Sequence, residues 1–393
     1  MREDTFMIQQ GGGPIRVMRI IARMNVGGPA VQVSGLMRSF NQKDFNQTLY
    51  TGFCSADEAD YLEVVARDIT SVRIEGLGRR IHLKDDLNAL IFLTREIRRI
   101  KPDIVHTHTA KAGFLGRIAS ILSLHPSIRI HTFHGHLLNG YFGPFKRLMV
   151  ICIEVILASF THQLLAVGDK VRQDLLKVRI GSPGKFGLMP PGLEITRLPR
   201  KSESQLSFHL LPEQLQCALI GRVTQIKRPD RFLDVVAECK NRGYNINFFV
   251  AGDGELFEYC RERILKEDLP VALLGWQTNI EKVLSAADIV LLTSDNEGTP
   301  LSLIQAGMAG LPVVSTRVGS VSEVVLDRVT GIIVDLDVQL IADAIGELAT
   351  DKKLRLKLGN SAHEFTLANF GVARLVQDHE ILYKELVANR AKS

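Results

Sequence analysis

Paired cysteines are missing from this 393-residue chain. No Cys-x-x-Cys motif is present, so a disulfide framework and a zinc–thiolate site are both disfavoured. Isolated cysteines of this kind are typical of a reducing compartment, and we expect a cytosolic protein. The five cysteines lie far apart in the sequence, at Cys54, Cys152, Cys217, Cys239 and Cys260.

Long apolar runs are also missing. The N-terminal residues contain acids and glycines instead of the apolar core of a signal peptide. The most apolar helical pattern, 148–160, contains Glu154 and is shorter than the roughly 20 residues that a bilayer requires. We predict a buried core helix there. The alternative is a surface helix in contact with lipid, preceded by Lys146 and Arg147.

The chain has little net charge, because basic and acidic residues nearly balance. The chain has 48 basic and 43 acidic residues, a net charge of +5. This small excess fits a phosphate-bearing ligand or an anionic membrane surface, and equally fits no charged partner. We expect no nucleic-acid partner. The chain also lacks a strand-linked Gly-x-Gly-x-x-Gly with a downstream acid, which argues against an NAD-dependent enzyme.

Short apolar runs instead alternate with helical patterns along the chain, as in βαβ units. A polar stretch, 193–213, interrupts this alternation without a clear period of its own. The pattern predicts an α/β protein of two doubly wound, Rossmann-like domains, 1–195 and 205–370. The expected strands are Ile15–Ile21, Gln47–Phe53, Ser71–Gly76, Asp103–Thr107, Ile128–Thr132, Gln163–Val167, Phe186–Met189, Leu215–Ile220, Ile246–Ala251, Val271–Leu274, Asp288–Thr293, Val313–Ser315 and Ile332–Val334.

The segment 294–310 is the most informative part of the sequence. It follows the apolar run 288–293, which reads as a buried parallel strand. Thr299 is a predicted N-cap and Pro300 a predicted first helical residue. The turn 295–298 then lies where doubly wound sheets bind ligands, and the helix N-terminus after it suits a phosphate.

This segment resembles the signature of the retaining, nucleotide-sugar-dependent glycosyltransferases of family 4, which have the GT-B fold. Glu297-Gly-Thr-Pro matches the first half of the signature, and Ala-Gly-Leu-Pro-Val-Val-Ser-Thr matches the part after it. The signature's second glutamate is replaced by Gln305. Gly319-Ser320 stands where the family often has Gly-Gly, before Glu323. In the family the last helix crosses back onto the first domain, which implies such a role for 371–393.

The resemblance implies the following donor site. Glu297 would steady the positive charge that develops on the donor sugar, while Arg222 and Lys227 would hold the diphosphate. Gln305 would bind the ribose with neutral hydrogen bonds, more weakly than a carboxylate would. The remaining donor-side residues are expected at turns, where backbone approaches the nucleotide or sugar: Gly221, Gly252, Gly254, Trp276, Gly298, Thr299, Pro300 and Leu301. For Trp276 a core position is equally compatible with the sequence.

The acceptor side is expected in the first domain. Gly27 and Gly28 precede Pro29, where we predict a helix whose N-terminus faces the cleft. Histidines are concentrated between 106 and 136, and the family places a histidine equivalent to His134 close to the reacting sugar. A metal site was considered for them, but no acid or cysteine accompanies them and the family uses no metal. His106 and His108 are expected to form the pocket or to be core groups, and His108 is a candidate acceptor-binding residue. Lys111 is either an acceptor-phosphate ligand or a solvated lysine.

The resemblance implies a retaining glycosyltransferase with Glu297, His134, Arg222 and Lys227 as its catalytic residues. The expected substrates are a nucleotide-diphosphate sugar, with UDP preferred, and a glycan or lipid-linked acceptor of polysaccharide biosynthesis. We expect no cofactor or metal, and contact with the cytoplasmic membrane face. Two alternatives remain open at this stage: a UDP-sugar 2-epimerase on the same fold, and a catalytically impaired sugar-nucleotide-binding protein.

Overall fold

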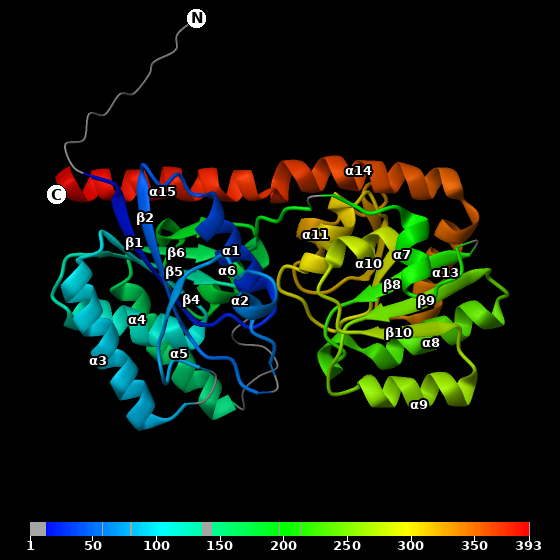
Figure 1. The fold of residues 1–393 in the computed structure, drawn as a ribbon, viewed down its shortest axis with the longest axis horizontal. Helices are drawn as coiled ribbons and strands as arrows, with labels where there is room; N and C mark the ends of the chain where they lie inside the picture. Colours follow the sequence, from blue (N-terminus) through cyan, green and yellow to red (C-terminus); the bar gives the residue numbers. More distant parts are fainter. Residues whose placement is uncertain are drawn as a thin grey trace, which may run out of the picture.

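Two lobes, each built on a parallel sheet, lie side by side in the computed structural model (Figure 1). The structure describes residues 13–56, 58–78, 81–135, 144–195, 197–212 and 214–392. The predicted α/β fold class, with two doubly wound domains, is confirmed.

The first lobe contains a seven-stranded sheet of order β3-β2-β1-β4-β5-β6-β7, with every neighbouring pair parallel. The order reverses at β1, so β1 and β4 form the topological switch point at which such sheets bind ligands. Its strands are β1 (Ile15–Arg23), β2 (Phe45–Gly52), β3 (Ser71–Arg73), β4 (Ile104–His108), β5 (Ile128–Phe133), β6 (Gln163–Ala166) and β7 (Phe186–Leu188). Its helices are α1 (Gly28–Ser39), α2 (Tyr61–Val64), α3 (Leu83–Ile100), α4 (Ala110–Leu122), α5 (Pro144–Ser159) and α6 (Asp169–Lys177).

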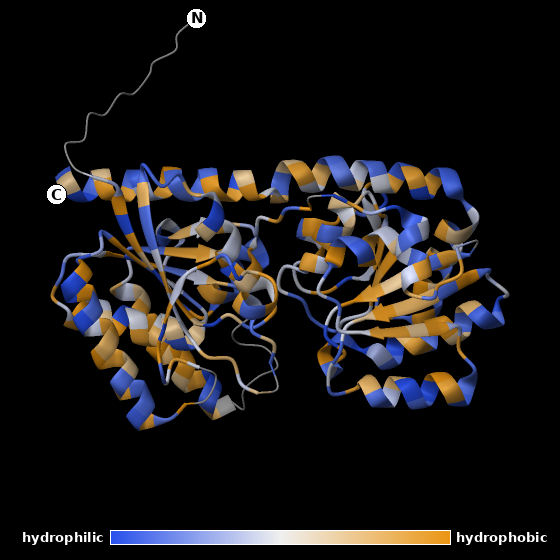
Figure 2. Cartoon of the chain, viewed as in Figure 1, coloured by the Kyte–Doolittle hydropathy of each residue, from blue (hydrophilic) through white to orange (hydrophobic). Residues whose placement is uncertain are grey.

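The second lobe repeats the plan with a six-stranded parallel sheet of order β10-β9-β8-β11-β12-β13. Its strands are almost uniformly apolar, as Figure 2 shows. All but the edge strand β10 are largely buried, because helices cover both faces of the sheet. The strands are β8 (Leu215–Ile220), β9 (Ile246–Ala251), β10 (Val271–Gly275), β11 (Ile289–Leu292), β12 (Val313–Thr316) and β13 (Gly331–Val334). The helices are α7 (Lys201–Ser207), α8 (Pro229–Asn241), α9 (Phe257–Glu267), α10 (Ile280–Ala286), α11 (Leu301–Met308), α12 (Val321–Val324), α13 (Val338–Thr350) and α14 (Lys352–Phe370).

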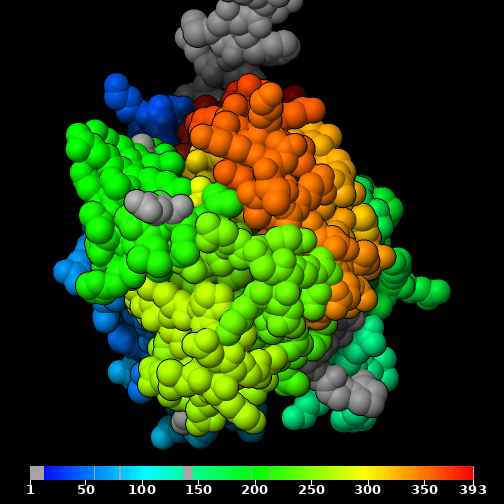
Figure 3. Space-filling model, turned by 90° about the vertical axis from the view of Figure 1, so that its right-hand side faces the viewer, coloured from blue at the N-terminus to red at the C-terminus, as the bar shows by residue number. Residues whose placement is uncertain are grey.

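The last helix, α15 (Val372–Lys392), continues the direction of α14 and runs back along the first lobe (Figure 1). It packs against α1, and its Leu375 and Tyr383 are fully buried in the core of that lobe. In the end-on view of Figure 3, the orange segment that includes α14 covers one side of the second lobe. The chain therefore crosses between the lobes twice, near Leu193 and near Gly371.

These two crossings are hydrogen-bonded to each other. The Leu193 N–H donates to the Phe370 carbonyl over 2.8 Å, and the Val372 N–H donates to the Leu193 carbonyl over 3.0 Å. Gly192 lies close to α15, since a Cβ there would be 2.5 Å from the Leu375 Cβ. The two crossings form one paired connection.

Two local predictions were wrong. The stretch 193–213, expected to be without regular structure, contains α7, which packs against α10. Helix α5, expected to be buried, leaves Leu148 59% and Ile156 59% exposed. Periodicity reports that a helix has an apolar face, but not whether another element covers it.

Candidate active site

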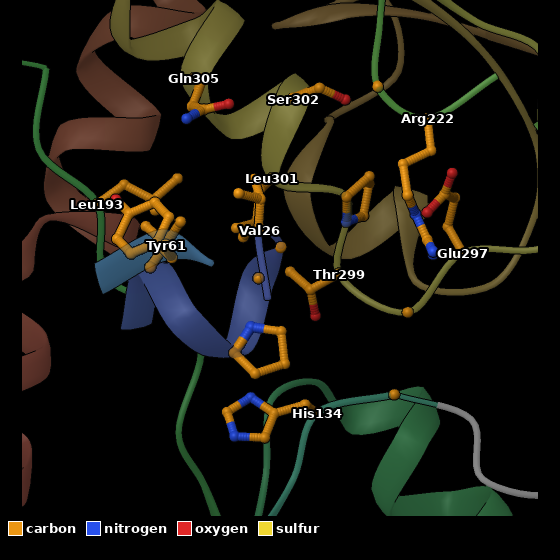
Figure 4. Close-up of a pocket in the computed structure, with 18 of the residues that line it drawn as sticks. Val26, Tyr61, His134, Leu193, Arg222, Glu297, Thr299, Leu301, Ser302 and Gln305 are labelled. Carbon is orange, nitrogen blue, oxygen red and sulfur yellow. The ribbon is translucent and has the colours of Figure 1, made fainter. Parts of the chain in front are cut away.

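A cavity of about 1410 Å³ lies between the lobes, and both lobes contribute to its walls. A drug-sized ligand fills about 300–1,000 Å³, so this cavity has room for two substrates at once. Figure 4 shows His134 on the first-lobe side, facing Thr299, Glu297 and Arg222 from the second lobe.

Glu297 follows β11 and is 8% exposed at the wall of the cavity. Its Oε1 accepts a hydrogen bond from the Lys227 Nζ over 2.5 Å and another from the Ser294 Oγ over 2.5 Å. Lys227 comes from the turn after β8, the strand that pairs with β11. Because these strands are parallel neighbours, their carboxyl ends bring the two charges together.

The loop that carries Glu297 is fixed by a set of ionic contacts below it. Arg231 donates to the Thr293 carbonyl over 2.6 Å and to the Asp295 carboxylate over 2.8 Å. Arg228 donates to the same carboxylate over 3.1 Å. These contacts hold the backbone on both sides of Ser294, so the position of the Glu297 carboxylate is determined before any ligand binds.

The β12–α12 turn supports Glu297 from the other side. Gly319 has a φ of +50°, and a Cβ at this position would lie 1.7 Å from the Glu297 carbonyl oxygen. Ser320 donates its N–H to that same oxygen over 3.2 Å, and its side chain is fully buried. The glycine at 319 is therefore required by backbone contact, whereas position 320 accepts a side chain.

Thr299 does not cap α11, contrary to the prediction. The helix begins at Leu301, and Pro300 occupies the N-cap position without a side-chain cap. The Thr299 hydroxyl instead donates to the Val167 carbonyl of the first lobe over 3.2 Å. The competing partner lies in another domain, which no local pattern reveals.

Most of the expected donor-side residues line the cavity. They are Gly221, Arg222, Lys227, Trp276, Glu297, Gly298, Thr299, Pro300, Leu301 and Gln305. Trp276 is 42% exposed, so it is not a core residue. Arg222 is exposed, and no described carboxylate pairs with its guanidinium.

Gly252 and Gly254 are not among the residues that line the cavity. A Cβ on Gly252 would lie 1.8 Å from the Gly221 carbonyl oxygen, and one on Gly254 would lie 2.5 Å from that of Val223. These glycines let the turns after β8 and β9 approach each other, and in this way they support Arg222 from behind.

On the acceptor side, Gly27, Gly28 and His134 line the cavity. Helix α1 begins at Gly28, with Pro29 in its first turn. His108 is fully buried behind His134, and its Nδ1 lies 2.9 Å from the His134 Nε2. Lys111 lies outside the lining residues: its ammonium donates to the Gly76 carbonyl over 2.6 Å and pairs with Asp86 over 2.6 Å. That position does not support a role in acceptor binding. His136 lies outside the described residues.

The first-lobe histidines surround a buried arginine. Arg19 on β1 is fully buried, and its Nη1 contacts the His108 Nε2 at 3.0 Å and the His106 Nδ1 at 3.3 Å. Burial, with the Arg19 charge as a further cause, lowers the pKa of His134 to about 3 and that of His108 well below its usual value. At neutral pH these imidazoles are therefore uncharged.

The lobes also touch outside the cavity wall. The Glu323 carboxylate, at the start of α12, accepts hydrogen bonds from the backbone N–H groups of Asp169 and Lys170, over 2.6 and 2.9 Å. A second-lobe carboxylate thus caps the first-lobe helix α6. At the floor of the cleft, a Cβ on Gly298 would lie 3.2 Å from the Gly135 Cα.

Two family models match the chain, one for each lobe. The model for Glycosyltransferase Family 4 matches residues 26–197, and the model for Glycosyl transferases group 1 matches residues 205–365. The chain is a glycosyltransferase, with a family 4 domain in its first lobe and a group 1 domain in its second. Its predicted enzyme class is thereby confirmed, and so is the resemblance that suggested it.

Curated relatives of this glycosyltransferase match along most of their length. The chain is 27% identical over 343 residues to the UDP-Gal:alpha-D-GlcNAc-diphosphoundecaprenol alpha-1,3-galactosyltransferase of Escherichia coli, covering 84% of this chain and 87% of that protein. It is 23% identical to the capsular polysaccharide biosynthesis glycosyltransferase CapM of Staphylococcus aureus, covering 83% and 88%.

Among solved structures, the complex of Anabaena HepE with UDP and glucose superposes with a TM-score of 0.80. The match covers 94% of this chain and 99% of the other, at 16% sequence identity. At this identity the likeness shows a common fold, which is GT-B.

Three residues of the glycosyltransferase site escaped the sequence interpretation. Ser294 lies inside the recognised segment, and only the fold shows that its hydroxyl reaches Glu297. Arg19 had a visible signal, since its charge stands in the middle of the strand, between the apolar pairs Val17-Met18 and Ile20-Ile21. Glu323 was noticed only as a neighbour of Ser320, and its partner helix in the other lobe was not predictable from spacing.

The histidine cluster is not arranged as a metal site. Among the described residues no group of three or more His, Cys, Asp or Glu side chains has a geometry that would hold a metal ion. The rings of His106 and His108 stack on each other, and the Arg19 Nη1 contacts one nitrogen of each. In the part of the chain that the structure describes, no helix is long and apolar enough to cross a membrane.

Proposed function

We propose that this glycosyltransferase moves a sugar from a UDP-linked donor to a lipid-linked or glycan acceptor in polysaccharide biosynthesis, with retention of configuration. The observation that carries the proposal is the pairing of Lys227 with Glu297 at the wall of the interlobe cavity, beside the exposed guanidinium of Arg222. Support also comes from the Escherichia coli and Staphylococcus aureus relatives, whose names specify a UDP-sugar donor and a capsular polysaccharide.

In this proposal the donor diphosphate binds Arg222 and Lys227, near the N-terminus of α11. Two cations that face a leaving diphosphate lower the energy of the transition state in which its charge grows. The Lys227 ammonium has three donors, so it binds phosphate while it keeps its bond to Glu297. The Gln305 amide and Ser302, which lie further along α11 at the cavity wall, then face the ribose.

The sugar lies between Glu297 and His134. The carboxylate steadies the positive charge that develops on the anomeric carbon, and burial at 8% exposure strengthens this effect. The acceptor hydroxyl attacks from the face that the diphosphate leaves, and a leaving-phosphate oxygen takes its proton. His134 does not act as the base, because its pKa of about 3 makes it a poor proton acceptor at neutral pH.

The acceptor enters from the first lobe, next to a membrane surface. Helix α5 exposes Phe145 by 80% and Leu148 by 59%, and Lys146 and Arg147 lie exposed between them. Apolar side chains with adjacent cations suit an anionic lipid surface.

The donor is tested first. The purified protein is screened by thermal shift with UDP-, GDP- and ADP-sugars, since a ligand of the folded state raises the melting temperature by mass action. The stabilising donor is then incubated with lipid-linked acceptors, and the anomeric configuration of the product is read by NMR. A UDP-sugar should stabilise the protein and give a product with the donor's configuration. Inversion, or release of a 2-epimer without transfer, would refute the proposal.

Membrane contact is tested separately by sedimentation with anionic and neutral vesicles. Phe145→Ser with Leu148→Ser should lower binding to anionic vesicles several-fold. The matched control is Leu265→Ser, which changes a leucine that is 76% exposed on α9 of the other lobe. Equal binding by all variants would exclude α5 as the contact.

We also propose that transfer requires no metal ion, because Arg222 and Lys227, which both line the cavity, would supply the positive charge that faces the diphosphate. Activity should survive EDTA unchanged. A loss that Mg²⁺ or Mn²⁺ restores would contradict this part of the proposal and leave the donor assignment standing.

A further inference from the structure

We propose that Arg19 is a positioning residue: acting through His108, it holds His134 in the tautomer that presents an Nδ1–H to the cavity. His134 then serves as a hydrogen-bond donor to an oxygen of the ligand.

The first step is the unusual environment of Arg19. It occupies the middle of a core strand, is fully buried, and contacts no carboxylate among the described residues. A buried charge without a counter-ion costs several kcal/mol, so an apolar residue would ordinarily stabilise this position better. Retaining an arginine here calls for a role other than stability.

The second step is that acceptors surround the Arg19 guanidinium. The Gln47 Nε2 donates to the Leu36 carbonyl over 3.1 Å, so its Oε1 is the atom that accepts from Arg19 over 2.8 Å. The Tyr383 hydroxyl of α15 accepts from Arg19 over 3.1 Å. An arginine has no acceptor to offer, so the imidazole nitrogen that faces it must also accept.

The third step assigns the protons in the series of hydrogen bonds that runs from Arg19 through His108 to His134. The His108 Nε2 accepts from Arg19 over 3.0 Å, so the proton of neutral His108 is on Nδ1. That Nδ1–H donates to the His134 Nε2 over 2.9 Å. The His134 Nε2 is then an acceptor, and the ring's remaining proton is on Nδ1. Figure 4 shows a ring nitrogen of His134 pointing into the cavity.

The hydrogen bonds of His106 also run outward from Arg19. The His106 Nδ1 accepts from Arg19 and from the Tyr383 hydroxyl, the latter over 2.5 Å. His106 therefore donates from Nε2 to the Thr132 Oγ1 over 2.7 Å. His379 stacks on His106, and its Nδ1 donates to the Leu375 carbonyl over 2.8 Å, so it leaves the proton positions on His106 and His108 unchanged.

His106, His108 and His134 are not protonated at neutral pH, so each keeps a single tautomeric proton. Burial and the Arg19 charge lower the pKa of His134 to about 3, and the same causes keep His108 and His106 neutral. A neutral imidazole has one donor and one acceptor, so its tautomer decides what the ligand meets.

The test reads the tautomer directly in the full-length protein. Protein labelled with ¹⁵N-histidine is examined by long-range ¹H–¹⁵N correlation NMR, and His134 is assigned by the signal that His134→Asn removes. Two substitutions of similar size are compared. His108→Gln keeps an oxygen for Arg19 and an N–H for His134, while His108→Met keeps neither. Arg19→Lys and Arg19→Met form a second pair, in case one variant fails to fold.

We expect His134 to carry its proton on Nδ1 in the wild type, in His108→Gln and in Arg19→Lys. The two methionine variants should show a mixed or Nε2–H tautomer, with kcat/KM lowered about tenfold, the size of one lost hydrogen bond. An Nε2–H tautomer in the wild type would overturn the inference, as would an unchanged tautomer in a folded methionine variant. The NMR result does not rest on the proposed function, whereas the kcat/KM result does, so the two can fail independently.

Discussion

At the scale of single residues, Glu297 and Lys227 are held together before any substrate binds. Their contact of 2.5 Å is formed by loops from two paired strands, and Ser294 adds a second hydrogen bond to the same carboxylate oxygen. A lysine that already neutralises a carboxylate keeps two ammonium hydrogens for a phosphate. In the proposed complex the pair therefore lies between the sugar of the donor and its diphosphate.

Replacing the charge of Glu297 should slow catalysis more than it weakens binding. For Glu297→Gln we expect kcat to fall by about 10²–10³, the range found when one electrostatic stabiliser of a transition state is removed. Steady-state kinetics with the identified donor measure this. The control is Glu258→Gln, an exposed acid on α9 outside the cavity lining, which should leave kcat unchanged. A small change in kcat with a large rise in KM would indicate a binding role only.

At Gln305 a substitution is expected to improve donor binding instead of impairing the enzyme. Gln305→Glu should lower the donor KM several-fold, because a carboxylate accepts hydrogen bonds from both ribose hydroxyls with charge assistance. Isothermal titration with UDP reports the same change without turnover. An unchanged or higher KM would mean that this side chain does not meet the ribose.

The residues that bear the motif were predictable because they act locally. Arg222, Lys227 and Glu297 each follow a strand, and parallel strands bring their carboxyl ends to one edge. Gly252 and Lys111 show where prediction from the sequence fails, because neither lines the cavity. A glycine needed for backbone contact and one needed for a ligand look alike in sequence, and the Asp86 partner of Lys111 was not predicted.

At the scale of elements, α6 begins where the other lobe supplies its cap. The first N–H groups of a helix have no intrahelical partners, and Glu323 accepts from two of them across the cleft. The charge also opposes the positive end of the α6 dipole. This contact joins the two lobes outside the cavity wall.

Removing that charge should loosen the lobes. Glu323→Gln is expected to cost about 1 kcal/mol in the closed state and to raise the donor KM while kcat changes less. Small-angle scattering should show a larger radius of gyration. Asp337→Asn is the matched control, since Asp337 caps α13 within the second lobe. If both variants give the same scattering profile as the wild type, the Glu323 contact does not set the closure.

Elements themselves were largely predictable, and their surroundings were not. Each strand predicted from the sequence is present, because buried parallel strands are continuous apolar runs. Thr299 failed as a cap because Val167, from another domain, competes for its hydroxyl. Helix α5 failed as a core element because no described residue covers Leu148 and Ile156, which are each 59% exposed.

At the scale of the whole molecule, five histidines of the first lobe are uncharged at neutral pH; four are buried in the protein, and His134 lines the cavity. Burial is the largest cause of the lowered pKa in each, and the pKa of both His134 and His379 falls to about 3. An unfolded histidine has a pKa of about 6.5. The five are His106, His108, His131, His134 and His379.

These shifts predict acid lability. Below about pH 6.5 these histidines bind protons in the unfolded chain but not in the folded lobe. The free energy of unfolding therefore has its full value above that pH and falls as the pH drops toward 3. Each such histidine contributes a slope of up to about 1.4 kcal/mol per pH unit. Thermal unfolding followed by circular dichroism should show a steep loss of Tm between pH 6.5 and 4.5. His379→Phe should make the slope shallower, and a Tm independent of pH would contradict the assignment.

The return of α15 to the first lobe has a consequence for how the protein is made. Tyr383 completes the buried cluster around Arg19 from the far end of the chain. During synthesis the first lobe leaves the ribosome early but cannot close its core until the final helix has emerged. The first lobe must wait for the second lobe to be translated, so the two halves of the enzyme mature together.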